Sequence, residues 1–279
     1  MSIKVTGLVR FGLLETIDAG MNAIEGSLMN RYNAVIVSLL ESEQIEWRSV
    51  VERITKICKA GDEKNIGVLV DAEETWIQDP VDALTILMMD TFNKKKAVVY
   101  NTMQLYRHDR LAFLKDSFEA AMQKNFILGA KLVRGAYMEK ERKRAVEKNY
   151  PSPIQASKEN TDKDYNEAIE FSINNIEKIA VIVASHNEES NLLATQVLDK
   201  LKLPHNHKHI HFSQLYGMSD NITFNLAKSG CSVSKYLPFG PIDDVIPYLM
   251  RRAQENSSVS GQMGRELGLI KKEMQRRKQ

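Results

Sequence analysis

The sequence predicts an α/β fold built on a parallel sheet, and three features of its 279 residues indicate this. Seven short apolar runs, rich in β-branched residues, each end at a polar residue or at glycine, which is typical of buried strands. Charged stretches with the apolar spacing of amphipathic helices lie between them. Two parallel strands need a long crossover connection, which is usually a helix of this kind. Polar residues follow the runs, where a (βα)8 barrel carries its chemistry, so a TIM-like barrel is the predicted architecture.

The expected elements follow one another along the chain. The strands are the runs Ile3–Thr6, Val68–Asp71, Ala97–Asn101, Ala130–Arg134, Val181–Ser185, His209–Gln214 and Ser232–Leu237. Helices are expected at Glu46–Lys59, Leu111–Lys124, Lys163–Ile179 and Glu189–Lys200, and a proline-containing loop at Tyr150–Thr161. The polar residues at the strand ends are Asp71, Asn101, Arg134, His186, Gln214 and Tyr236. Because periodicity does not show closure, an open doubly wound sheet is the alternative.

Composition excludes several classes of protein. A formal charge of +2, from 38 basic and 36 acidic residues, gives no argument for a nucleic-acid partner. Cys58 and Cys231 stand too far apart in sequence to suggest a disulfide framework or a metal site, and we expect both to be reduced. No apolar run reaches the roughly 18 residues that span a bilayer. We therefore expect an intracellular protein that can still touch a membrane peripherally.

The segment Lys131–Glu139 is a candidate anion site. It joins a buried strand to a helix through Gly135 and Ala136, which let a ligand approach the backbone, while Lys131 and Arg134 add positive charge. The alternative is a strand end whose basic residues are merely solvated. The sequence has no GxGxxG or GxxxxGKS motif, so a dinucleotide would not bind through a Rossmann or P-loop cradle.

A second candidate is the arginine pair Arg251 and Arg252. Glu255 follows them by four and three residues, so its carboxylate can hold either guanidinium on one helix face. Two guanidinium groups are suited to gripping a carboxylate in a dry pocket. The alternative is an ordinary surface ion pair.

Two charged residues near strand ends allow two interpretations each. Asp71 is either a helix cap, the simpler explanation because Glu73 and Glu74 follow it, or the partner of a pocket cation. Lys4 alternates with apolar neighbours, so it either points into the barrel beside Asp71 or is solvated.

The histidines give a weaker signal. His186 has no other ligand type at metal-binding spacing. Four further histidines stand at every second position, and because side chains alternate along a strand, they would lie on one side of it. This allows a metal hypothesis, with solvated loop histidines as the alternative. This cluster consists of His205, His207, His209 and His211. No metal ligand set is predicted.

Several blocks together resemble the signature segments of the proline dehydrogenase family, of the monofunctional type. The two main blocks are Lys131–Glu139 and Lys235–Ser258. Further correspondence runs through Val70–Glu74, Tyr100–Tyr106, Ser185–Asn187 and Phe212–Met218. The resemblance covers nearly the whole chain, with the blocks in the family's order. It implies a distorted (βα)8 barrel that holds FAD without covalent attachment and without a Rossmann fold.

The resemblance also implies roles for individual residues. The residues implied to contact FAD are Ala72, Gln104, Lys131, Arg134, Gly135, Ala136, Ser185 and His186. Those implied to bind the substrate are Lys4, Leu215, Tyr236, Arg251 and Arg252, with Glu255 anchoring the arginines. Asp71 and Lys131 are the implied catalytic residues, because Asp71 orders the charged network and Lys131 hydrogen-bonds the flavin near N5.

The reaction implied is hydride transfer from C5 of L-proline to flavin N5, which gives Δ1-pyrroline-5-carboxylate in the first step of proline catabolism to glutamate. A membrane quinone is the implied electron acceptor, which would explain peripheral membrane contact. We expect a bacterial cytoplasmic location, with the mitochondrial matrix as the alternative. The bulk of Tyr236 favours proline over 4-hydroxyproline, and a 4-hydroxyproline dehydrogenase is the alternative activity.

The chain departs from the family pattern in two places. The family barrel has another strand and helix before the strand of Lys4, so we expect residues 1–279 to form one catalytic domain that is N-terminally truncated and incomplete as a barrel. A non-catalytic remnant is therefore a further alternative. Met138 stands where bacterial bifunctional relatives often have an aromatic residue on the cofactor.

Overall fold

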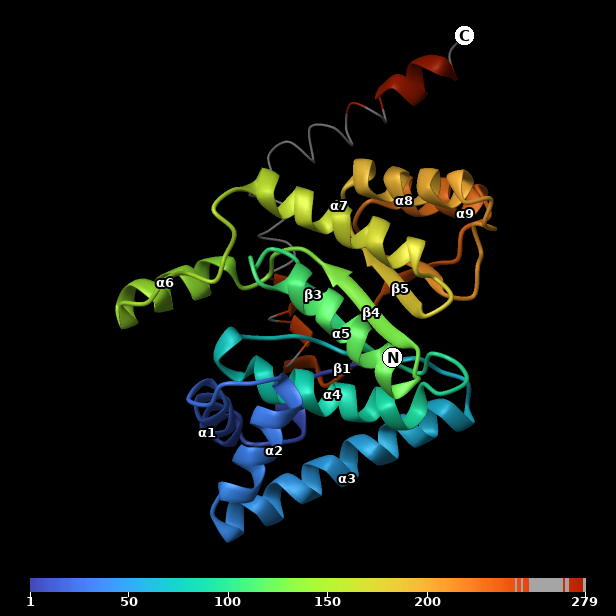
Figure 1. Ribbon diagram of the computed structural model, residues 1–279. Helices are drawn as coiled ribbons and strands as arrows, with labels where there is room; N and C mark the ends of the chain where they lie inside the picture. The colour runs from blue at the N-terminus through green and yellow to red at the C-terminus, as the bar shows by residue number, and fades with distance from the viewer. Residues whose placement is uncertain (244, 247, 251–267, 269–270, 278–279) are drawn as a thin grey trace. The chain divides into compact units, whose positions relative to one another are not determined.

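The computed structural model describes residues 1–243, 245–246, 248–250, 268 and 271–277 (Figure 1). The chain forms two compact units, Met1–Lys235 and Tyr236–Gln279, and each is considered by itself. The first unit holds the sheet and the helices that cover it.

The seven strands form one sheet in the order of the sequence, β1 to β7. Their bounds are β1 Ser2–Ile3, β2 Val68–Val70, β3 Val99–Gln104, β4 Leu128–Val133, β5 Ile179–Ala184, β6 Ile210–Leu215 and β7 Val233–Tyr236. Neighbouring strands from β1 to β6 pair in parallel. A doubly wound sheet reverses its strand order at a switch point, and this sheet does not, so that alternative is wrong.

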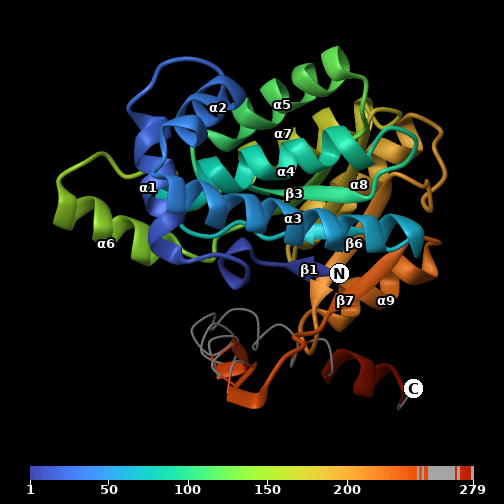
Figure 2. The ribbon, with the colours of Figure 1, turned by 90° about the horizontal axis from the view of Figure 1, so that it is seen from below.

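Helices connect successive strands and cover the outer face of the sheet. The bounds are α1 Phe11–Asn22, α2 Leu28–Ser38, α3 Glu41–Glu63, α4 Gln78–Phe92, α5 Arg110–Lys124, α6 Met138–Lys148, α7 Lys158–Asn174, α8 Glu188–Lys200 and α9 Asp220–Lys228, with short 3-10 turns η1 Val5–Gly7 and η2 Thr75–Ile77. Figure 2 shows α3, α4, α5 and α7 on one side of the curled sheet. The strands thus form a curled half-barrel, and among the described residues β1 and β7 are its unpaired edges.

Most predicted elements are confirmed, with three corrections at their ends. The first strand stops at Ile3 and the chain turns into η1, because the Gly7 N–H bonds to the Lys4 carbonyl at 3.1 Å. The helix expected to reach Ile179 ends at Asn174, and Ile179 instead begins β5. The loop expected up to residue 161 ends earlier. Ser157 caps α7 by accepting a hydrogen bond from the Asn160 N–H at 3.2 Å, and such a cap favours a helix start.

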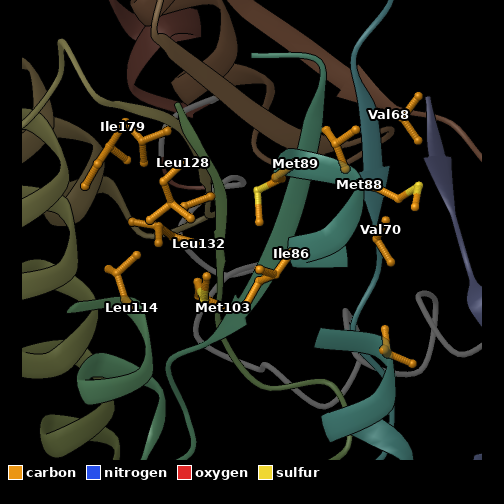
Figure 3. Packing of buried hydrophobic residues seen from close by; sticks show 14 of the residues in the cluster. Val68, Val70, Ile86, Met88, Met89, Met103, Leu114, Leu128, Leu132 and Ile179 are labelled. Carbon is orange, nitrogen blue, oxygen red and sulfur yellow. The ribbon is translucent and has the colours of Figure 1, made fainter. Parts of the chain in front are cut away.

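The core lies between the outer face of the sheet and the helices. Val68 and Val70 of β2 pack with Met88 and Met89 of α4 in one buried cluster (Figure 3). The same cluster contains Leu114 of α5, Leu128 and Leu132 of β4, and Ile179 of β5, and also Cys58. Both cysteines are buried and unbridged, as predicted. Because side chains alternate along a strand, the residues between these apolar positions face the inner side of the half-barrel.

A buried carboxylate joins α1 to the start of α4. Asp18 accepts hydrogen bonds from the side chain of Asn22 at 2.7 Å and from the backbone N–H of Asp79 at 3.1 Å. Asp79 in turn pairs with Arg31 of α2 at 2.8 Å. Burial is the largest cause that raises the pKa of Asp18, and repulsion from the Asp79 carboxylate is the second. Together they raise this pKa to about 7.

We expect Asp18→Asn to remove a pH-dependent loss of stability. The folded pKa of Asp18 lies above its unfolded value, so folded Asp18 keeps its proton longer, and the free energy of unfolding falls as the pH rises from about 4 to about 7. Between about pH 5 and pH 8, the free energy of unfolding of the parent chain should fall by on the order of 2 kcal/mol more than that of the variant. Urea unfolding at several pH values measures this difference. The control Glu25→Gln removes an exposed carboxylate and should follow the parent. Parallel pH profiles for the parent and Asp18→Asn would contradict this account.

Candidate active site

The parallel register brings three predicted residues, together with Thr102, to one level of the sheet. Ile3 is paired with Val70, so the next residues on each strand, Lys4 and Asp71, stand side by side. In the same way Asp71 lies beside Thr102, which is paired with Lys131. The carboxyl ends of adjacent parallel strands therefore present a lysine, an aspartate, a threonine and a second lysine in a row.

Asp71 and Lys131 form an ion pair on the inner face. Lys131 Nζ donates to Asp71 Oδ1, and the two side chains are only 11% and 16% exposed. The caps of the following helices are Glu74 and Ile77, so Asp71 is not a helix cap. The interpretation of Asp71 as the partner of a cation is the correct one, because a buried carboxylate needs a compensating charge.

Lys4 lies at the same edge but pairs with a different carboxylate. Its Nζ is 3.3 Å from Glu73 Oε2 and donates to the Tyr137 hydroxyl at 3.4 Å, 5.9 Å from the centre of the Tyr137 ring. Burial alone would lower the pKa of Lys4, but Glu73, Tyr137 and Asp71 together raise it. The ammonium group therefore stays charged beside the Asp71–Lys131 pair.

Gln104 ends β3, and both of its amide N–H groups are bonded within the protein. Its Nε2 donates to the Glu73 carbonyl at 2.7 Å and to the Tyr106 hydroxyl at 2.9 Å, and Arg107 donates to its Oε1 at 3.4 Å. Ala72 is buried next to Glu73 in the chain. Since both amide N–H groups of Gln104 are used, it could act toward a bound cofactor by packing or by accepting a hydrogen bond at Oε1.

A buried ionic network supports this strand end from behind. Asp82 of α4 accepts from Asn101 at 2.8 Å and from Arg110 at 2.6 Å. Arg110 also donates to Asp109 at 2.5 Å, and Arg107 donates to Asp109 at 2.8 Å. Burial opposes ionisation of Asp109, but the arginines outweigh it and hold the pKa of Asp109 well below its usual range. The end of β3 is thereby tied to the start of α5.

Arg134 forms a second centre, at the ends of β4 and β5. It donates from Nε to Asp162 at 2.8 Å, from Nη1 to Ser185 at 2.7 Å and from Nη2 to Ser190 at 2.7 Å. The guanidinium carbon lies 3.8 Å from the centre of the Tyr165 ring. A guanidinium has five N–H donors, so two remain for an anion after the described contacts. The side chain is 21% exposed and can be reached.

His186 is held beside the end of β6. Its Nδ1 lies 3.0 Å from Ser219 Oγ, and the Leu215 N–H points to its Nε2 at 3.4 Å. Ser219 adopts a left-handed backbone with φ of 53°, and Gly217 before it has φ of 77°. These turn residues bring Ser219 back toward β5, so Ser185, His186 and Leu215 gather at one edge of the sheet.

Gly135 and Ala136 are exposed in the turn before α6. A Cβ on Gly135 would lie 2.3 Å from Met138 Sδ. A side chain at this position would meet the thioether of Met138, and the approach of a ligand to the Gly135 backbone stays a prediction.

The remaining predicted substrate residues belong to the second unit. The ring of Tyr236 lies 6.1 Å from that of Tyr248. Arg251, Arg252 and Glu255 lie outside the described residues, so their predicted clamp stays a prediction.

The described part of the chain gathers no group of three or more metal-binding side chains. The clustered histidines turn to separate partners: His205 to Asp199, His207 to Glu177, His209 to the Ile176 carbonyl and His211 to Ser234. A cavity of about 620 Å³ is lined by α6 and by the loop after it, including Tyr150 and Ile154. None of the predicted site residues lines it.

Sequence reasoning missed three residues of the site. Glu73 was taken as a reason to regard Asp71 as a cap, although it holds Lys4. Asp162 and Ser190 hold Arg134 from α7 and α8, and no local motif marks them. For Glu73 a signal existed, because an acidic residue two positions after a strand-end aspartate can reach the neighbouring strand.

Comparison with known sequences places this geometry in a family. A profile described as "Proline dehydrogenase" matches residues 2–265. The chain belongs to the proline dehydrogenase family.

Curated relatives agree with the family profile. "Proline dehydrogenase 1, mitochondrial" of Drosophila melanogaster is 38% identical over 253 residues, which make up 87% of this chain and 37% of that protein. "Hydroxyproline dehydrogenase" of Xenopus laevis is 36% identical over 255 residues, or 90% of this chain and 55% of that protein. The chain thus spans between about a third and about half of the length of these two relatives.

Solved structures share the fold. The crystal structure of proline utilization A (PutA) from Bdellovibrio bacteriovorus, inactivated by N-propargylglycine, superimposes with a TM-score of 0.76 at 23% identity. The match covers 93% of this chain and 24% of that one. It supports the TIM-barrel-like architecture that the sequence predicts.

The residues present fit the cofactor that the family uses. Arg134 offers two N–H donors to an anion at the ends of β4 and β5, and Lys131 lies on the inner face of the sheet. Asn187 caps α8 next to Ser185, so a helix amino end points to the same edge. This donor set suits the anionic phosphates of a dinucleotide.

We expect Lys131→Met to destabilise the protein by about 3 kcal/mol, because it leaves Asp71 as an unpaired charge of low exposure. The double variant Lys131→Met/Asp71→Leu should regain most of this free energy of unfolding in denaturant titration. Lys143→Met removes an exposed pair with Glu147 and should cost less than about 0.5 kcal/mol. If the double variant were as unstable as the sum of its single variants, the pair would not be coupled.

Proposed function

We propose that this chain oxidises L-proline to Δ1-pyrroline-5-carboxylate with FAD as its cofactor. The observation that carries the proposal is the row of charges at the strand ends, in which Lys4 and Lys131 face one side of the sheet beside Asp71. Membership of the proline dehydrogenase family supports it.

Lys131 and Arg134 would hold the cofactor. Arg134 binds the phosphates of the cofactor with its two N–H groups that make no described hydrogen bond. Lys131 donates toward the flavin ring, and Asp71 holds the Lys131 ammonium in place. When bound, FAD accepts a hydride at N5, and the chain supplies orientation and electrostatics.

Lys4 would bind the carboxylate of proline, and by resemblance Arg251 and Arg252 complete the clamp while Leu215 and Tyr236 pack on the ring. Lysine has three N–H donors. Lys4 donates one of them to the Tyr137 hydroxyl and lies 3.3 Å from Glu73 Oε2, so its ammonium keeps donors for the substrate. Proline nitrogen must lose its proton before oxidation. Burial beside cationic groups lowers its pKa in the direction that this requires.

A second candidate activity is the oxidation of 4-hydroxyproline. The relative from Xenopus laevis is named a hydroxyproline dehydrogenase and is nearly as similar as the Drosophila protein. The bulk of Tyr236 supports proline, since the added hydroxyl would need the space that the ring fills. Comparing turnover of the two imino acids separates these activities.

The electron acceptor that we propose is a membrane quinone, reached by peripheral association. Over the described part of the chain, no helix has the length and apolarity that crossing a bilayer requires. The Drosophila relative carries a mitochondrial name, which supports the mitochondrial matrix over the bacterial cytoplasm as the compartment.

The function is tested by anaerobic mixing of the FAD-loaded chain with L-proline. We expect the yellow flavin absorbance to bleach and Δ1-pyrroline-5-carboxylate to appear in equal amount. A preparation that carries intact FAD and stays oxidised would contradict the proposal.

Replacing Arg252 by methionine should weaken proline binding by about 2 to 5 kcal/mol, because one partner of a charged pair is lost. The Michaelis constant for proline measures this effect. Arg276→Met provides the control, since Arg276 is an exposed arginine paired with Glu273 in the same unit. If Arg252→Met left the Michaelis constant at the parent value, Arg252 would not bind the substrate.

A further inference from the structure

Glu73 is fixed at four of its atoms. Its backbone N–H donates to Gln78 Oε1 at 3.0 Å, and its carbonyl accepts from Gln104 Nε2 at 2.7 Å. Its Oε1 accepts from the Thr6 hydroxyl at 2.7 Å, and its Oε2 lies 3.3 Å from Lys4 Nζ. A carboxylate held in this way has little freedom to move.

The partner of this carboxylate is far less constrained. The Lys4 side chain is 45% exposed, whereas that of Glu73 is 10% exposed. Lysine has a flexible stem with four rotatable bonds, so an unheld ammonium would sample many positions at this exposure. The fixed carboxylate on one side and Tyr137 on the other restrict it to one position beside the Asp71–Lys131 pair.

Glu73 also joins the two halves of the proposed site. Its side chain holds Lys4, which the proposed function assigns to the substrate, and its carbonyl holds Gln104, which lies on the cofactor side. Both contacts come from one residue, two positions after the catalytic candidate Asp71. A shift of Glu73 would therefore move both halves together.

We propose that Glu73 is a positioning residue that sets the place and charge of the Lys4 ammonium for binding the substrate carboxylate. The inference deepens the proposed function and rests on it for the identity of the substrate. It assigns Glu73 no contact with proline or with the flavin. Thr6 contributes to the same positioning, because its hydroxyl donates to the Glu73 carboxylate and orients it.

The central test is Glu73→Gln in the FAD-loaded chain. Glutamine keeps the size of the side chain and can still accept from Thr6, but it carries no charge to hold Lys4. We expect the Michaelis constant for proline to rise about tenfold while kcat stays within about twofold, as for loss of a binding contact. The basic limb of the pH profile should move to lower pH, since Lys4 loses the carboxylate that favours its charged form.

Glu74→Gln is the matched control. Glu74 is the next residue, is equally buried and also pairs with a lysine, but its partner is Lys140 of α6. Its kinetics and pH profile should equal those of the parent. Effects of similar size in both variants would mean that loop disruption, and not the position of Lys4, is responsible. A Glu73→Gln variant that binds proline as well as the parent, or better, would overturn the inference.

A second measurement separates this inference from the proposed function. In the chain labelled with 13C-lysine, NMR titration of Lys4 needs neither substrate nor cofactor. Glu73→Gln should lower the pKa of Lys4 and change its chemical shift, and Glu74→Gln should do neither. If these changes appear but proline bleaches no flavin in the parent, the proposed function fails and the coupling of Glu73 to Lys4 stands. An unchanged Lys4 resonance in Glu73→Gln would refute the coupling itself.

Discussion

The arrangement of the site depends on the parallel register of the strands. Because β1 to β4 run in the same direction and in fixed alignment, residues separated by more than a hundred positions reach one edge at one level. Alternation then divides each strand between two environments. Val70 and Leu132 face the helices, while Asp71 and Lys131, one residue away from them, face the inside.

The charges described at this edge of the inner face are tolerated because they are paired. Asp71 pairs with Lys131, Lys4 pairs with Glu73, and the pairs lie next to each other at the strand ends. Removing the partner of a buried charge costs more free energy than the pair itself contributes. Substituting one member of such a pair alone is therefore destabilising. The network of Asp82 and Arg110 behind β3 follows the same rule and keeps the strand end in place.

The sequence predicted the strands well because β-branched runs between charged helices leave few other choices. All seven runs became strands, although β1 is shorter than expected, since the backbone turns at Lys4. Long-range side-chain pairing was harder to predict. Two interpretations fitted Asp71, and only the position of Lys131 on β4 decided between them. Asp162 carries no local mark, since its role follows from where α7 packs.

The central claim is that the charged inner edge of the half-barrel holds both the flavin and the carboxylate of the substrate. A crystal structure of the chain with FAD and the unreactive ring carboxylate cyclopentanecarboxylate tests it most directly. The account predicts the flavin ring near Lys131, its phosphates at Arg134, and the carboxylate at Lys4. A flavin bound elsewhere, for example in the cavity beside α6, would contradict it.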